Sequence, residues 1–75
     1  MKVSKERKLE IRKQLIESAI EIVTEKGFRS ATMREISTKA GMGTATIYNY
    51  FPTKEKILFA YFEDKHSELD EVLSN

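Results

Sequence analysis

The sequence predicts an all-α fold, and three observations point to it. Apolar residues recur at spacings of three and four over long stretches, which is the period of an amphipathic helix. No stretch alternates apolar and polar residues as a half-buried strand does, and the chain contains one proline. Its three glycines fall between the periodic stretches, where helices are expected to end or turn: Gly27, Gly41 and Gly43.

The first predicted helix runs from about Lys5 to Lys26. Gly27 suits the left-handed conformation just past a helix end, and Phe28 is placed to fold back on Val23 as the apolar contact of a Schellman cap. The inward stripe consists of residues three and four apart, namely Ile11, Leu15, Ala19, Ile22 and Val23, widened by Ile16 and Ile20.

Thr32 opens a second, short helix that ends at Gly41. Its hydroxyl can accept a hydrogen bond from the backbone N–H of Glu35, whose carboxylate can reach back to the Thr32 N–H. This Thr-x-x-Glu pattern is a capping box. The inward face comprises Met33, Ile36 and Ala40.

Two further helices follow the turn Gly41-Met42-Gly43. One covers about residues 44–51 and stops because Pro52 cannot continue a helix and biases Phe51 out of helical geometry. The other begins after Thr53, which caps it. Its predicted inner face is Ile57, Leu58, Tyr61 and Phe62, continued by Leu69, Val72 and Leu73. We expect one shared core that contains Ile22, Val23, Phe28, Ile36, Ile47 and Phe51.

Composition limits the function classes. Seventy-five residues make one small domain, without cysteine and with a single histidine, His66. We therefore expect no disulfide framework, metal site or cofactor. There is no paired carboxylate, nucleophile–base pair or glycine-rich phosphate loop, so we expect no enzyme. No apolar stretch approaches the ~18–20 residues of a membrane span, and no signal peptide follows the charged N-terminus. We expect a soluble, cytoplasmic protein.

The formal net charge of +1 conceals an asymmetry along the chain. Residues 1–56 hold twelve basic and seven acidic residues, whereas residues 57–75 hold one basic and five acidic residues. The basic part suits a polyanion, and the acidic part should face away from it. Charge runs are also ordinary solvated surface, so charge alone leaves both interpretations open.

The most informative unit is residues 33–51, which form a short helix, a glycine turn and a second short helix. In a helix-turn-helix protein the second helix enters the major groove of DNA. That helix needs small residues at its start and hydrogen-bonding groups on its outer face. Here these are Thr44, Ala45, Thr46, Tyr48 and Asn49. Ordinary three-helix bundles contain such turns too, so the residues alone do not decide the function.

The run from Thr32 to Leu58 resembles the amino-terminal signature of TetR-family (tetracycline-repressor) transcriptional regulators. Its most specific part is Ile47-Tyr48-Asn49-Tyr50-Phe51-Pro52, followed by Lys54-Glu55. The resemblance covers about residues 8–62. It implies a three-helix helix-turn-helix bundle, homeodomain-like, plus a fourth connecting helix.

This resemblance also implies an organisation and a function. Residues 1–8 would form a flexible basic arm, residues 9–62 the DNA-binding domain, and residues 63–75 the C-terminal part of the connecting helix, which leads to an absent regulatory domain. Family members bind palindromic operators in double-stranded DNA as homodimers, mostly repress transcription, and release DNA when a small-molecule inducer binds the regulatory domain. Without that domain, the inducer site is absent and this chain should be monomeric.

Implied DNA contacts follow residue by residue. Thr44, Ala45 and Thr46 lie at the groove-facing start of recognition helix 44–51. Phosphate contacts are implied for Thr32 and Lys54 at two helix starts, and for Tyr48, Asn49 and Tyr50, with Tyr48 also able to touch a base.

Two positions depart from the family pattern. Gly43 stands where Ser is common, which weakens the cap of the recognition helix. Thr44 stands where a basic residue is frequent, and Arg34 is a candidate to compensate, unless it is simply solvated. The arm residues Lys2, Lys5, Arg7 and Lys8 are candidates for phosphate or minor-groove contacts, with an idle charged tail as the alternative.

The alternative function is a small helical protein-interaction module without DNA binding. It would keep the bundle and use Tyr48, Tyr50 and Met42 as an apolar contact. Salt separates the two functions, because phosphate binding weakens steeply with ionic strength.

Overall fold

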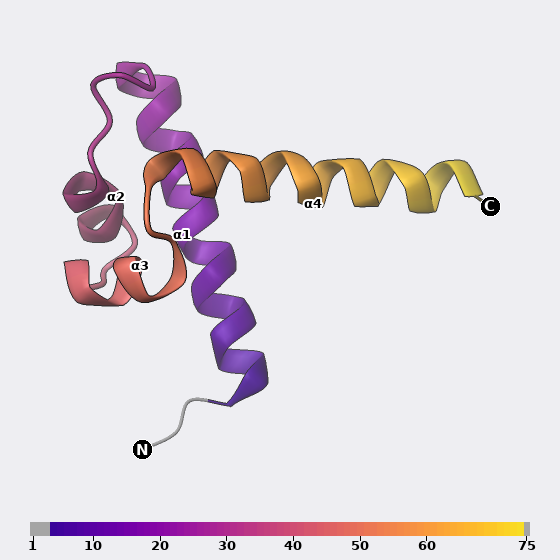
Figure 1. Ribbon diagram of the computed structural model, residues 1–75, viewed down its shortest axis with the longest axis horizontal. Coiled ribbons are helices and arrows are strands. Elements are labelled where there is room, and N and C mark those ends of the chain that lie inside the picture. Colours follow the sequence, from indigo (N-terminus) through magenta and orange to yellow (C-terminus); the bar gives the residue numbers. More distant parts are fainter. Residues whose placement is uncertain (1–3, 75) are drawn as a thin grey trace.

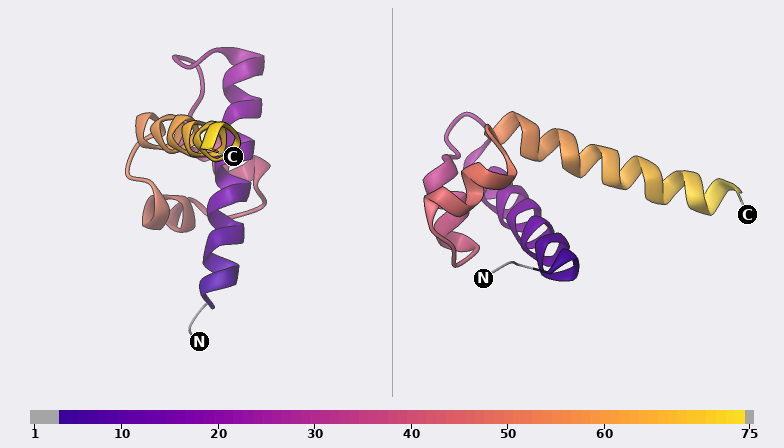
Figure 2. Two further views of the ribbon diagram at one scale, coloured as in Figure 1. Left: turned by 90° about the vertical axis from the view of Figure 1, so that its right-hand side faces the viewer. Right: turned by 60° about the horizontal axis from the view of Figure 1, so that its bottom comes forward.

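A computed structural model describes residues 4–74, and this part of the chain contains four helices and no strand. They are α1 (Lys5–Lys26), α2 (Met33–Lys39), α3 (Thr44–Tyr50) and α4 (Lys54–Ser74). α2 packs against α1 and α3, and α4 packs against α1. The second half of α4 projects away from the other three helices (Figures 1 and 2). The all-α prediction and the order of the helices are confirmed.

The hydrophobic core lies where the four helices meet. Each helix contributes one large, completely buried side chain, and these are Leu15, Ile36, Ile47 and Ile57. The predicted core is confirmed for Ile22, Ile36, Ile47 and Phe51, which are buried, and for Val23, which packs against them.

Phe28 is a correction to the predicted core. It lies outside the core cluster and is partly exposed, and its ring lies 4.5 Å from the ammonium of Lys54. The Schellman arrangement is also wrong, because Gly27 has the expected positive φ of 85° but a ψ of 156°, outside the left-handed helical region. This backbone leads the chain away from α1 and toward the start of α4.

Local capping explains where the helices begin. The capping box of Thr32 and Glu35 is present at the start of α2. Gly43 provides no side-chain cap for α3, as its lack of a side chain requires. The Thr53 hydroxyl accepts a hydrogen bond of 3.2 Å from the Lys56 N–H, as expected for the cap of α4.

The second half of the predicted flexible arm, residues 5–8, belongs to α1 in the structure. Ser4 caps α1 by accepting a hydrogen bond of 3.1 Å from the Arg7 N–H, so that Lys5, Arg7 and Lys8 are helical. Lys2 lies outside the described residues.

α4 buries less of its surface than predicted. Ile57 and Ala60 are buried and Tyr61 packs against the core, but Phe62 is 63% exposed, which contradicts its predicted inward position. The reason is that α4 leaves the bundle after its first turns, so only its N-terminal part has a partner helix. Arg12 of α1 pairs with Asp64 at 2.9 Å near the point of departure. The predicted strip farther along the helix is exposed too: Leu69, Val72 and Leu73.

None of the helices within residues 4–74 is long and apolar enough to cross a membrane.

Candidate nucleic-acid interface

The turn between α2 and α3 is fixed by its own backbone. Gly41 has a φ of 73°, which favours glycine. The N–H of Gly41 donates to the Thr38 carbonyl at 3.0 Å, and the N–H of Met42 donates to the Ser37 carbonyl at 2.9 Å. The Ser37 side chain is buried and donates to the Arg34 carbonyl at 2.9 Å. These bonds satisfy the end of α2 and set the direction in which α3 begins.

α3 has a buried face and a solvent face. Ile47 is completely buried, and Phe51 is buried just after the helix ends. Thr46 and Tyr50 are half-buried, and Tyr50 packs against the core. The exposed predicted residues are Thr44, Ala45, Tyr48 and Asn49, and they share one side of this short helix. The outer surface of α3 is therefore small at its start and carries hydrogen-bonding groups further along.

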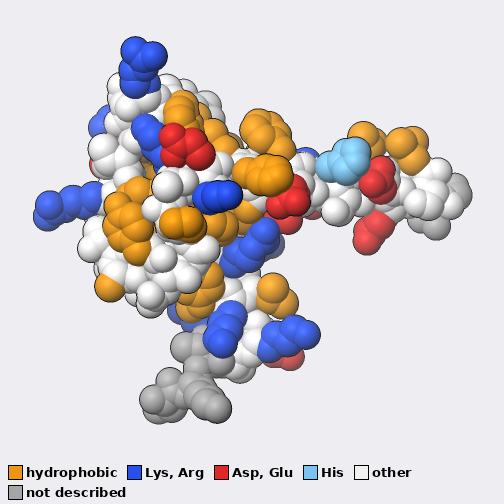
Figure 3. Space-filling view, in the orientation of Figure 1, with side chains coloured by type: hydrophobic (Ala, Val, Ile, Leu, Met, Phe, Trp, Pro, Cys, Tyr) orange, Lys and Arg blue, Asp and Glu red, His pale blue; other side chains and the backbone are white. Residues whose placement is uncertain are grey.

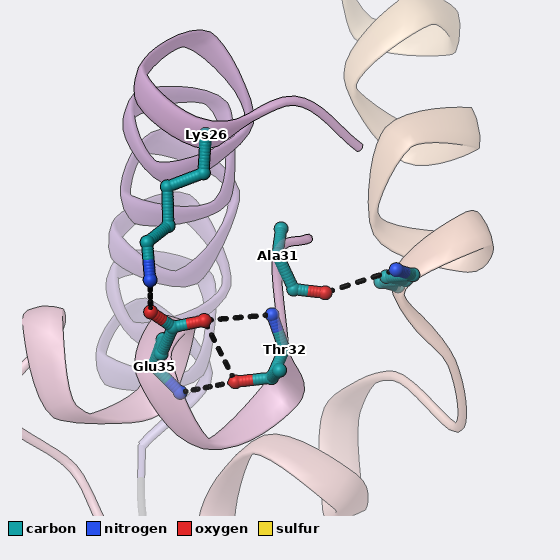
Figure 4. A network of polar contacts seen from close by, with 5 residues as sticks. Lys26, Ala31, Thr32 and Glu35 are labelled. Atoms are coloured by element: carbon teal, nitrogen blue, oxygen red, sulfur yellow. Dashed lines mark hydrogen bonds and ion pairs between the residues drawn. The ribbon is translucent and has the colours of Figure 1, made fainter. Parts of the chain in front are cut away.

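A polar network holds the start of α2 (Figure 4). The N–H and hydroxyl of Thr32 both donate to Glu35 Oε1, at 3.2 and 3.0 Å, and the Glu35 N–H donates to Thr32 Oγ1 at 3.1 Å. The Lys26 ammonium forms an ion pair with the other oxygen of the same carboxylate. The pKa of Glu35 is lowered, chiefly by the hydrogen bond from Lys26 and next by the hydrogen bond from the Thr32 side chain.

This network occupies the groups of Thr32 that are expected to contact a DNA phosphate. Its hydroxyl and its N–H are both engaged by Glu35. Arg34, in contrast, is an exposed residue of the first turn of α2 and keeps its cationic side chain at the surface.

Lys54 makes contacts that sequence reasoning did not foresee. Its ammonium donates to the carbonyl oxygens of Phe28 at 2.6 Å, Arg29 at 3.2 Å and Ala31 at 2.9 Å. The structure therefore directs Lys54 to the loop between α1 and α2, whereas the expected partner was a DNA phosphate. No sequence signal identifies such acceptors, because every residue has a carbonyl and only the tertiary fold brings these three to Lys54.

The ion pairs of Lys26 and Lys39 between α1 and α2 were also not predicted from the sequence. Lys39 lies 3.3 Å from Glu21 and 3.7 Å from Glu25, so that it joins α2 to α1. Lys26 reaches Glu35, nine positions along the chain, because α2 packs against α1.

Charge is distributed unevenly over the molecule. Acidic side chains line the projecting part of α4, and basic side chains gather over the N-terminal half of α1 and at the edge of the bundle far from α4 (Figure 3). On this face, the acidic part of α4 is thus separated in space from the basic side chains over α1.

The comparisons with known proteins agree with this geometry. The family model for bacterial regulatory proteins of the tetR family matches residues 15–61, a stretch that contains all of α2 and α3. The bundle and this match together define a helix-turn-helix domain of the kind found in bacterial regulatory proteins. The chain belongs to the tetR family.

Relatives come from several bacteria. The chain is 36% identical over 58 residues to the fatty acid metabolism regulator protein of Bacillus subtilis, a match covering 77% of this chain and 30% of the relative. It is 36% identical over 64 residues to the HTH-type transcriptional regulator BetI of Escherichia coli, which covers 85% of this chain and 33% of BetI. The chain thus spans about a third of the length of these curated relatives.

A solved structure shows the same fold. The fatty acid degradation regulator FadR from Bacillus halodurans superposes with a TM-score of 0.79 at 29% identity, and the match covers 99% of this chain and 37% of FadR.

Proposed function

We propose that this chain is the DNA-reading part of a transcriptional repressor and binds a double-stranded operator with α3 in the major groove. The observation that carries the proposal is the outer surface of α3, where Thr44, Ala45, Tyr48 and Asn49 are exposed together on the second helix of a helix-turn-helix. The major groove is wide enough to admit one helix, and small residues at its start permit close approach.

The exposed side chains of α3 are assigned to base edges or to phosphates according to their position along the helix. Thr44 and Ala45, with the half-buried Thr46, stand at the N-terminal end of α3 and are assigned to base edges. Tyr48 and Asn49 lie further along and are assigned to phosphates, and Tyr48 also has the length to contact a base. The phenol of Tyr50 and the guanidinium of Arg34 complete the proposed contact surface.

An operator for this chain is proposed to be palindromic. In a longer protein carrying this chain, a homodimer would place two copies of α3 about one DNA turn, roughly 34 Å, apart. Dimerisation and binding of a small-molecule inducer are assigned to the part of such a protein that these 75 residues do not span.

The alternative of a protein-interaction module receives less support from the geometry. It relies on Tyr48, Tyr50 and Met42 as one apolar contact. Tyr50 and Met42 pack against the core, which leaves Tyr48 as the exposed member of the three. One exposed tyrosine makes a poor apolar interface, whereas its hydroxyl suits a phosphate.

Selection from a random duplex library tests the proposal directly. We expect the chain to enrich a short sequence, and a longer family member carrying it to enrich that sequence as an inverted repeat. The affinity should fall steeply with salt, because phosphate contacts release counterions. Absence of enrichment together with salt-independent capture of a protein would contradict DNA binding and favour the interaction module.

A matched pair of variants tests the interface itself. Tyr48 and Phe62 are both exposed aromatic residues, 54% and 63% respectively, but only Tyr48 lies on α3. Tyr48→Ala should weaken operator binding roughly tenfold, the size of one lost polar contact to DNA. Phe62→Ala should leave binding unchanged in the same titration. Equal effects of the two substitutions would place the DNA elsewhere.

A further inference from the structure

The exposed start of α3 consists of short side chains. Gly43 provides no side chain before the helix, and Thr44 and Ala45 are both exposed behind it. A Cβ added at Gly43 would meet nothing within 4 Å, so open space adjoins the first turn of the helix. The floor of a major groove can therefore come close to the methyl groups of Thr44 and Ala45.

The side chains of α3 limit which bases this surface can select. Guanine is typically read by Arg or Lys and cytosine by Asp or Glu, whose charged groups pair with the polar atoms at the base edges. α3 has the sequence TATIYNY and carries no charged residue. The hydroxyl of Thr44 both donates and accepts, so it can pair with any base edge. Selection at the start of α3 therefore depends on its methyl groups.

A methyl group on the protein favours one base. Thymine is the base that presents a methyl group, at C5, in the major groove. Contact between that group and Ala45 Cβ or Thr44 Cγ2 removes apolar surface of both partners from water. The same protein methyl placed on guanine O6 or on the cytosine amino group would take a polar group out of water without giving it a partner. Both effects favour thymine.

The two methyl groups are held in defined positions. Alanine has no side-chain rotamers, and the β-branched threonine is restricted at χ1. The backbone that carries them is anchored by Ile47, which is completely buried, and by the hydrogen bonds of the turn before α3. Little conformational entropy is therefore lost when these methyl groups meet a base.

We infer that the start of α3 selects thymine, because the methyl groups of Thr44 and Ala45 contact thymine C5 methyl groups in the operator half-site. The inference rests on the proposed function. The site is the DNA-facing start of the second helix of the helix-turn-helix, and the inference adds the chemical group that this site recognises.

Replacement of single thymines by deoxyuridine, in a duplex that the chain enriches, tests the inference without any protein variant. Deoxyuridine lacks the C5 methyl and keeps every hydrogen-bonding group of thymine. Binding should weaken about fourfold at a thymine that faces α3, the effect of one buried methyl group. The slope of log affinity against log salt should not change, because no phosphate contact is lost. A half-site without thymine, or one in which no replacement weakens binding, would overturn the inference.

5-Methylcytosine separates recognition of the methyl group from the ease with which A·T pairs deform. Replacing a sensitive T·A pair by C·G should weaken binding. Placing 5-methylcytosine opposite the same guanine should then strengthen binding about fourfold, because it returns a methyl group to the same place in the groove. No recovery would assign the preference to DNA shape and contradict the inference.

Protein variants identify the residue that makes the contact. Thr44→Ser removes one methyl group and keeps the hydroxyl, and Ala45→Gly removes the other methyl group. On the thymine duplex at least one of these variants should bind about fourfold more weakly than the wild type, and deoxyuridine at the sensitive position should then cause no further loss. An effect of the substitution on folding is common to both duplexes and cancels in this comparison.

Asn49→Ala is the matched control on the same helix, because Asn49 is exposed and assigned to a phosphate. It should weaken binding to the thymine and deoxyuridine duplexes by the same factor. If Thr44→Ser and Ala45→Gly also showed equal losses on the two duplexes, another residue would make the methyl contact and the inference would be wrong.

The outcomes also separate the inference from the proposed function. If the chain enriches no duplex, the proposed function fails and the inference fails with it. If the chain enriches a duplex whose binding is indifferent to C5 methyl groups, the proposed function stands and the inference alone fails.

Discussion

Phe51 marks the point at which the chain turns from α3 into α4. Its backbone is extended, with φ of −139° and ψ of 120°, because Pro52 disfavours the helical conformation of the residue before it. The extended backbone ends α3 and lets the ring enter the core, where it is 6% exposed.

Phe51→Ala should therefore destabilise the domain by roughly 3–5 kcal/mol, the usual cost of removing a buried aromatic ring. In a domain of this size, such a loss should leave the variant largely unfolded. Thermal denaturation followed by circular dichroism should then show little or no cooperative transition. Phe62→Ala is the control, and because Phe62 is exposed its midpoint should stay near that of the wild type. A cooperative transition of Phe51→Ala close to the wild-type midpoint would contradict this account of the core.

Individual residues differ in how well the sequence predicts them. Phe51 was predictable because its position depends on an adjacent proline. Phe28 was predicted to fold back on Val23, but the ψ of the glycine before it does not allow the Schellman arrangement. Phe62 was predicted on the inner face of its helix because it continues an apolar pattern, and a pattern does not show where the partner helix ends. A phosphate contact is predicted for Lys54, whereas its carbonyl partners in the structure lie 23 to 26 positions away along the chain, beyond the reach of a local pattern.

Among the elements, the turn before α3 shows how backbone conformation selects glycine. An added Cβ would meet nothing within 4 Å at either Gly41 or Gly43, so space does not distinguish them. Their φ values do, at +73° for Gly41 and −76° for Gly43.

Opposite effects on stability are expected at these two glycines. Gly41→Ala should cost about 1 kcal/mol, because a side chain is strained at positive φ. Gly43→Ser should stabilise by a few tenths of a kcal/mol, because serine supplies the cap oxygen that α3 lacks. Urea unfolding of the two variants provides the measurement, and destabilisation by both would mean that crowding, rather than φ, governs the turn.

The start of α2 should loosen in acid. Lys26 and Thr32 hold the pKa of Glu35 below its ordinary value of 4.5, so the unfolded chain takes up this proton at a higher pH than the folded chain. The stability from this carboxylate is therefore complete above pH 4.5 and is lost as the pH falls through the lowered pKa of the folded state.

Nuclear magnetic resonance titration of the Thr32 and Glu35 amides measures this effect. Both should report one transition below the ordinary carboxyl value, and Glu35→Gln should remove it. A Glu35 pKa at or above 4.5 in the folded chain would show that the pairing with Lys26 does not persist in solution.

Helix starts were the elements best predicted from sequence, because capping depends on residues three apart. The direction of α4 was not predictable. It depends on the packing of its first turns on α1 and on the Arg12–Asp64 pair, which joins residues 52 positions apart.

At the scale of the whole molecule, we expect a monomer in solution. The strip of Leu69, Val72 and Leu73 is exposed but lies among acidic residues that would repel one another across a symmetric pairing. A standard interface buries about 800 Å² on each partner, which three side chains do not supply. Sedimentation equilibrium at tens of micromolar checks this, and a stable dimer without DNA would show that the exposed Phe59 and Phe62 extend the strip into an interface.

The projection of α4 also gives the molecule an electric dipole. Its acidic half is held away from the basic bundle, and the macrodipole of the helix itself has the same sense, with its negative end outermost. In the field of a polyanion a dipole experiences a torque, so the protein should rotate with α4 outward before contact, even though its net charge of +1 attracts it only weakly. This rotation acts within a Debye length, about 8 Å at physiological ionic strength, and stopped-flow association rates should accordingly fall as salt rises. Encounters would then begin with the bundle already turned toward the double helix, which shortens the search over orientations.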